Sequence, residues 1–139
     1  MKANVEFISM GKVRTLEDAV AFITDSGEPN VGVTIDFLHL IRTGGGAADI
    51  RAMDPALIGY VQVCDGPAGL AREEWNDEGF EQRQMPGEGE FPLAELIAAI
   101  PAGVVIAAEV PHRALREAGV SAAERARRAV EGTRRFLPS

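Results

Sequence analysis

Four side chains with oxygen donor atoms recur along the chain, each in or next to an apolar run: Glu6, Asp36, Gln62 and Glu109. Three carboxylates and one amide oxygen suit a hard divalent cation such as Mn²⁺ or Mg²⁺, and without histidine or thiolate in the set zinc is less favoured. Such a cation could bind adjacent oxygens of a small polyhydroxy or keto substrate, acidify the neighbouring C–H and stabilise the enediolate that forms. The alternative interpretation is a set of ordinary rim carboxylates that accept hydrogen bonds from loop amides.

Two further residues, His39 and Arg83, could contact a substrate bound at such a site. His39 follows Asp36 by three residues, and it is either a structural histidine or a group that faces the same cluster. Arg83 opens the stretch RQMPGEGEF, which lacks the lysine of a phosphate-binding loop and leads into a helix that opens with proline. We interpret the stretch as a turn that directs Arg83 toward the site, where its guanidinium could bind a substrate oxygen or carboxylate. Glu88 and Glu90 of the same turn are predicted to face solvent.

The elements that must position these residues are short apolar runs separated by helical patterns and loops. Strands are predicted over 3–9, 30–37, 58–65 and 103–110. Helices are predicted over 15–27, within 44–57, and over 92–100 and 121–137. Residues 66–91 read as a long polar connection. Alternating strands and helices imply a parallel sheet whose carboxyl ends carry the site, and the candidate ligands fall close to those ends.

Composition limits the class of protein. The chain has 139 residues, 46% of them hydrophobic, which is enough for one domain over 1–139. A net charge of −7 argues against nucleic-acid binding and against attachment to an anionic membrane, and no apolar run approaches the length of a membrane span. The single cysteine, Cys64, lies in an apolar run and is interpreted as a small core residue of a cytoplasmic protein.

The closing helix, predicted over 121–137, carries many arginines, which we interpret as its solvated face. The helical period predicts that a stripe of smaller and apolar residues faces the core on the opposite side. That stripe consists of Ala122, Ala126, Ala129, Val130, Thr133 and Leu137.

Five segments in order resemble the C-terminal half of the xylose-isomerase-like TIM barrels, the sugar phosphate isomerase/epimerase family. These segments are VEF (5–7), GVTIDFLHLIRTGG (32–45), GYVQVCDGP (59–67), RQMPGEGEFPLAELI (83–97) and AAEVPH (107–112). The resemblance implies a metal site formed by Glu6, Asp36, Gln62 and Glu109. It also implies that His39 and Arg83 contact the substrate. In the epimerases of this family the two glutamates act as the acid/base pair, which would here be Glu6 and Glu109.

Two departures from the family pattern keep other functions open. Many members carry histidine where this chain has Gln62, and glutamine there is similar to the 3-dehydroshikimate dehydratase branch, which would make the protein a lyase. A TIM barrel has eight strands, whereas four are predicted here, so the expected fold is a (β/α)4 half-barrel. Such a half would be completed by a second copy in a homodimer or by a separate N-terminal half. A truncated, non-catalytic binding or assembly module is the remaining alternative.

Overall fold

The computed structural model describes residues 1–138, in which four strands alternate with helices. The strands are β1 (Ala3–Glu6), β2 (Val31–Asp36), β3 (Ile58–Val63) and β4 (Val105–Ala108). The α-helices are α1 (Leu16–Ser26), α2 (Phe37–Arg42), α3 (Ala47–Ala52), α4 (Trp75–Glu81), α5 (Leu93–Ala98), α6 (Arg113–Glu117) and α7 (Ala122–Arg134). The 3₁₀ turns are η1 (Pro55–Leu57) and η2 (Arg72–Glu74).

The strands form one parallel sheet in the order β1-β2-β3-β4, which confirms the predicted α/β class. Glu6 pairs in register with Thr34, Asp36 with Gln62, and Gln62 with Ala107. Residues paired in register, and residues two apart on one strand, point to the same face of a sheet. The side chains of Glu6, Asp36 and Gln62 therefore lie on one face, close to the carboxyl ends of their strands.

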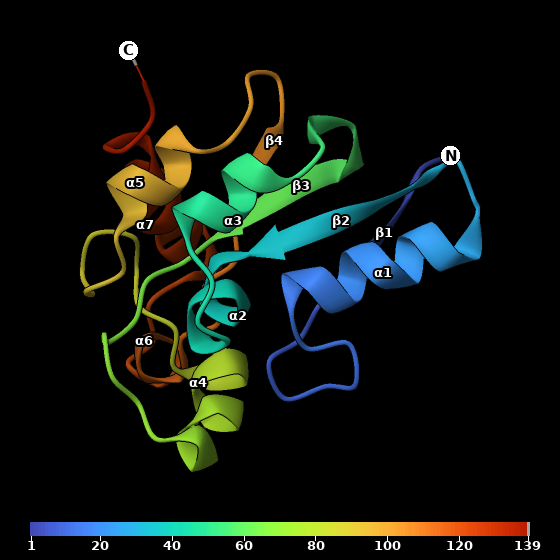
Figure 1. Ribbon diagram of the computed structural model, residues 1–139. Helices are drawn as coiled ribbons and strands as arrows, with labels where there is room; N and C mark the ends of the chain where they lie inside the picture. The colour runs from blue at the N-terminus through green and yellow to red at the C-terminus, as the bar shows by residue number, and fades with distance from the viewer. Residues whose placement is uncertain (139) are drawn as a thin grey trace.

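The opposite face of the sheet is covered by helices. Side chains of α1, α3 and α5 share one hydrophobic core with the alternate strand residues Val33, Ile35, Val61 and Val63. Figure 1 shows α1 running beside β2 and α3 beside β3, with α2, α4 and α6 gathered beyond the end toward which β2 points. Cys64 is fully buried in the same core, as predicted, and burial raises the pKa of its thiol. No helix within residues 1–138 combines the length and the hydrophobicity that crossing a membrane requires.

The ends of α1 show why this segment folds as predicted. Thr15 caps the helix: its side chain accepts from the Asp18 N–H, and the Asp18 side chain accepts from the Thr15 N–H, both at 3.1 Å. Gly27 ends the helix in the left-handed region with φ of 65°, where glycine avoids the strain of a side chain. Leu16, Ala19 and Ile23 are buried against the sheet.

Three short helices at the carboxyl end of the sheet were not predicted. The strand predicted over 30–37 ends one residue earlier, and α2 begins directly at Phe37 because the Asp36 side chain caps it. The polar connection predicted over 66–91 contains η2 and α4. The third of these helices, α6, follows β4. These helices have five to seven residues, too few for a helical period to stand out in the sequence.

The core-facing stripe predicted for α7 is largely wrong. The helix buries Ala129, Gly132 and Thr133, whereas Ala122, Ala126, Val130 and Leu137 are exposed. A Cβ atom at Gly132 would lie only 2.4 Å from the Pro86 carbonyl oxygen. The helix thus packs through a narrow line of small residues, beside the edge strand β4 rather than over the middle of the sheet.

Candidate active site

The predicted metal ligands lie around the carboxyl ends of the strands. Glu6 ends β1 and Asp36 ends β2, and together with His39 of α2 they bring donor atoms within 4.8 Å of one another. Gln62 pairs in register with Asp36. Glu109 directly follows β4, and its N–H donates to the β3 backbone at 3.1 Å. The sheet therefore brings residues more than a hundred positions apart to one rim, here called the carboxyl rim.

Asp36 is fully buried, and each of its carboxylate oxygens has a partner. Oδ1 accepts a hydrogen bond from the Leu38 N–H at 2.8 Å, and this bond caps α2. Oδ2 accepts a hydrogen bond from Arg83 Nη1 at 2.5 Å. A carboxylate without solvent needs such donors, because an unpaired buried charge is very costly. Asp36 thus both starts a helix and holds an arginine in the rim.

Arg83 points into the carboxyl rim, the direction predicted for it. Its side chain is 4% exposed. Its Nη1 forms an ion pair with Asp36 Oδ2 and lies 3.3 Å from Glu109 Oε2. On the other side, Nε donates to the Gly79 carbonyl oxygen at 3.0 Å. The guanidinium is therefore held between the residues of two strand ends and the backbone of α4.

Two buried oxygens at the rim lack a hydrogen bond. In the described part of the chain, residues 1–138, these two atoms are Gln62 Oε1 and Glu109 Oε2. Glu109 Oε2 has only its ion-pair contact with Arg83. A buried oxygen without a donor costs about 1–3 kcal/mol, so such atoms usually mark a missing partner. Carboxylate and amide oxygens are the ligands that Mg²⁺ and Mn²⁺ prefer. The donor set of Glu6, Asp36, Gln62 and Glu109 therefore fits a divalent cation.

Burial changes the pKa values of three rim groups. It raises the pKa of Glu6, and the Asp36 carboxylate adds to that rise. The pKa of Glu109 is raised to about 7, first by burial and then by the neighbouring Asp36 carboxyl group, while Arg83 opposes the rise. Burial also lowers the pKa of His39. Each shift favours the uncharged form, as burial does. The neighbouring carboxylates add to the shift for the two glutamates and oppose it for His39.

The turn that carries Arg83 is fixed by Asp65, to which sequence reasoning gave no role. Asp65 is 1% exposed and accepts three backbone N–H groups: Gly66 at 2.9 Å and Phe91 at 3.0 Å on Oδ1, and Gly87 at 2.9 Å on Oδ2. Its backbone also pairs with Gln84, next to Arg83. An aspartate followed by glycine at a strand end was the available signal for such a turn. Glu88 and Glu90 are exposed, as predicted.

Helix α4 covers the rim and was missed because its sequence is polar. Glu78 is buried and pairs with Arg42 of α2, with Arg42 Nε donating to Oε2 at 2.6 Å. The next residue, Gly79, provides the carbonyl that holds Arg83 and lies beside the His39 ring. The pair between Arg42 and Glu78 therefore fixes the helix that contacts two candidate substrate-binding residues.

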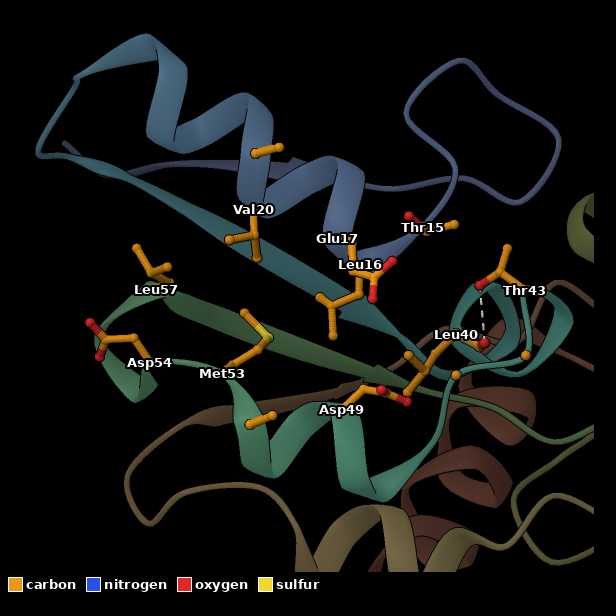
Figure 2. Close-up of a pocket in the computed structure, with 14 residues that line it drawn as sticks. Thr15, Leu16, Glu17, Val20, Leu40, Thr43, Asp49, Met53, Asp54 and Leu57 are labelled. Carbon is orange, nitrogen blue, oxygen red and sulfur yellow. Dashed lines mark hydrogen bonds between the residues drawn. The ribbon is translucent and has the colours of Figure 1, made fainter.

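A groove of about 610 Å³ lies away from this rim, between α1 and α3 (Figure 2). Leu16 and Val20 approach it from α1, and Met53 and Leu57 approach it from the segment after α3. None of the predicted site residues lines it. Its walls are mainly apolar, although Glu17, Asp49 and Asp54 are among its lining residues. The carboxyl rim, where charged groups contact one another in a buried setting, is the better candidate for chemistry.

A parallel sheet with helices on one face and polar groups at the strand carboxyl ends is the arrangement found in the TIM-barrel class of α/β proteins. Residues 1–136 match the family described as xylose isomerase-like TIM barrel, and the chain belongs to this family. The resemblance found in the sequence is thereby confirmed. No curated protein sequence matches the chain.

Several solved structures share the fold. The IolI protein with a bound zinc atom is 20% identical, with a TM-score of 0.79 over 100% of this chain and 51% of that chain. A xylose isomerase domain containing protein from Salmonella typhimurium LT2 is 20% identical, with a TM-score of 0.74 over 99% and 51%. D-psicose 3-epimerase in the presence of D-fructose is also 20% identical, with a TM-score of 0.68 over 99% and 49%. The chain thus spans about half the length of these proteins, which confirms the half-barrel fold.

Proposed function

We propose that the chain is a divalent-metal-dependent sugar or sugar phosphate isomerase/epimerase-like protein, which moves a proton next to the carbonyl of a small polyhydroxy or keto compound. The observation that carries the proposal is the carboxyl rim, where carboxylates, an amide oxygen and an arginine converge. Family membership supports it, as do the structural neighbours D-psicose 3-epimerase and L-ribulose 3-epimerase.

The proposed cation site consists of Glu6, Asp36, Gln62 and Glu109. We expect Mn²⁺ or Mg²⁺, because the set offers oxygen atoms only. The zinc atom of the IolI structure supports a divalent cation in general terms. When bound, the cation would polarise a substrate oxygen and make the adjacent C–H more acidic.

The acid/base work is assigned to Glu6 and Glu109. Glu6 ends β1 and Glu109 directly follows β4, and these are the two edge strands of the sheet, so the two glutamates would approach a substrate in the rim from different sides. One would remove a proton and the other would return one. Arg83, beside Glu109, would stabilise negative charge on a substrate oxygen, and His39 would contact the substrate from the side of Glu6.

A lyase of the dehydroshikimate dehydratase type is the second candidate, and Gln62 is the residue that favours it. Its amide oxygen takes the place of the histidine that many family members carry, and this oxygen is among the buried atoms of residues 1–138 without a hydrogen bond. The two reactions differ in their products. An isomerase leaves the mass of the substrate unchanged, whereas a dehydratase releases water, so mass spectrometry of the product separates them.

Titration calorimetry with Mn²⁺ and with Mg²⁺ tests the cation site. The wild type should bind at least one of them, and a hundredfold excess over Kd should stabilise the fold by about 2.7 kcal/mol. Glu109→Gln should weaken binding tenfold or more, because it removes a charged ligand. The exposed Glu131→Gln on α7 should bind like the wild type and serves as the control. Failure of both cations to bind the wild type, or equal binding by Glu109→Gln, would leave the non-catalytic module as the better account.

The open edges of the sheet support a partner that completes the barrel. Strands β1 and β4 are the edges, and exposed apolar side chains accompany them: Phe22 on α1, Val105 on β4 and Val130 on α7. We propose that a second (β/α)4 unit, another copy of this chain or a separate N-terminal half, pairs with these edges. Sedimentation analysis should then show a dimer or a complex. A folded monomer at high dilution would contradict this.

The buried Cys64 fits a reducing compartment such as the cytoplasm.

A further inference from the structure

The contacts of His39 determine which of its ring nitrogens carries the proton. The residue is 3% exposed, and its Nδ1 faces Ser9, itself 1% exposed. The Ser9 backbone N–H donates to Nδ1 at 3.4 Å, and Ser9 Oγ lies 3.1 Å from the same nitrogen. A backbone N–H can only donate, so Nδ1 must be the acceptor. In a neutral ring the proton then resides on Nε2.

The Ser9 hydroxyl is consistent with this assignment. Its Oγ also lies 2.9 Å from Met10 Sδ, so the hydroxyl hydrogen could point at either the sulfur or the ring. If it pointed at the sulfur, Oγ could accept from a protonated Nδ1, but that proton would then face the Ser9 N–H, donor against donor. Sulfur is also a weak acceptor, whereas the imidazole nitrogen is a strong one.

The ring is held in this orientation from its other side by α4. A Cβ atom at Gly79 would lie 4.0 Å from His39 Cε1 and 3.1 Å from Met10 Cε, so the helix backbone approaches the ring closely. Turning the ring over would place carbon, instead of Nδ1, against the Ser9 donors. Both hydrogen bonds would be lost, and the buried Ser9 N–H would be left without its acceptor.

We propose that Ser9 is a positioning residue that holds His39 as the Nε2–H tautomer, so that His39 donates a hydrogen bond to a substrate oxygen beside Glu6 and does not ligate the cation. Nε2 lies 3.9 Å from Glu6 Oε1, too far for a hydrogen bond, which leaves the N–H available. A protonated nitrogen has no lone pair for a metal. Distance alone would admit His39 as a ligand with Glu6 and Asp36, and the contact with Ser9 decides against it. The substrate contact rests on the proposed function, whereas the tautomer does not.

Histidine ¹⁵N NMR of the free protein reads the tautomer directly. The chain has two histidines, so a His112→Asn variant assigns the spectrum. Asparagine is a good helix cap, and His112 caps α6 through its own Nδ1, so this substitution should preserve the fold. We expect His39 to show a protonated Nε2 and an unprotonated Nδ1 at neutral pH. A protonated Nδ1, with Nε2 free or also protonated, would overturn the proposal.

Ser9→Ala tests the contribution of the hydroxyl. It removes the shorter of the two contacts and leaves the backbone donor at 3.4 Å. The Nδ1 resonance should move part of the way toward the protonated position, because only the longer contact with the backbone N–H then disfavours the Nδ1–H tautomer. An unchanged spectrum would mean that Ser9 Oγ does not stabilise the Nε2–H tautomer. A variant that fails to fold would not affect the wild-type measurement, which decides the tautomer by itself.

Adding Mg²⁺, which is diamagnetic, separates this proposal from the cation site. If Mg²⁺ binds and His39 keeps its proton on Nε2, His39 is not a ligand, as proposed. Loss of that proton on binding would make His39 a ligand and contradict the proposal. A spectrum that does not respond to Mg²⁺, together with no binding heat, would count against the proposed cation while the tautomer assignment stands.

Discussion

We expect Glu78→Gln to destabilise the protein by about 3–5 kcal/mol, because it leaves a buried arginine without its counter-charge. The side chains of Arg42 and Glu78 are 3% and 4% exposed. Arg42 donates to both carboxylate oxygens of Glu78, and its Nη2 also donates to the Pro67 carbonyl at 2.9 Å. Glutamine keeps one acceptor but places an NH₂ group against the guanidinium, so one charged hydrogen bond becomes a donor–donor contact.

The magnitude follows from the burial of the pair. An exposed ion pair contributes about 0.2–1 kcal/mol, whereas removing one partner of a buried pair leaves a charge that water cannot reach. The matched control is Glu131→Gln, which breaks an i,i+4 pair on α7 with Arg127, whose side chains are 54% and 50% exposed. We expect this control to cost about 0.3–0.5 kcal/mol. Replacing both partners, as in Arg42→Met with Glu78→Leu, should recover much of the loss.

Urea unfolding followed by circular dichroism measures these differences, provided that the slope of the transition is equal among the variants. Glu78→Gln should shift the midpoint far more than Glu131→Gln. If the free energies of unfolding of the two variants differ by less than about 1 kcal/mol, the guanidinium of Arg42 is hydrated or finds another partner in Glu78→Gln, and the argument from burial fails.

Three further changes test other parts of the fold. The pKa of Glu109 is raised from 4.5 to about 7, so the folded state holds this proton more tightly than the unfolded state. In metal-free buffer stability should therefore fall as pH rises from about 4.5 to 7, by about 1–2 kcal/mol after allowance for solvent access, and Glu109→Gln should flatten this profile in thermal melts. Asp65→Ala strands three backbone donors and should cost about 3–5 kcal/mol in urea unfolding; a cost below about 1 kcal/mol would mean that water replaces the carboxylate. Gly132→Ala would ordinarily favour a helix by about 1 kcal/mol, but here it should destabilise, because the added carbon meets the Pro86 carbonyl; a higher melting temperature would refute that contact.

Much of the fold could be predicted because its strands are short apolar runs with helices between them. Asp36 and Glu109 stand out for the same reason, since each is a polar residue at or just past the end of such a run. The failures have a common physical cause, which is that they depend on partners far away in the chain. The predicted stripe of α7 assumed a broad apolar floor, but the helix lies beside an edge strand and packs through small residues such as Gly132.

The same cause explains why the most consequential part of the site was missed. The segment REEWNDEGFEQR, residues 72–83, is polar, and a single sequence gives no sign that Glu78 is buried. Its burial is possible only because Arg42, 36 residues earlier, neutralises it. That pair places Gly79 against the His39 ring and under Arg83. Glu78→Gln should therefore loosen α4 before it unfolds the sheet, and amide exchange in α4 should accelerate more than exchange in β2. Equal acceleration in both would mean that α4 and the sheet open together, and that the ion pair stabilises the whole domain rather than the cover of the site.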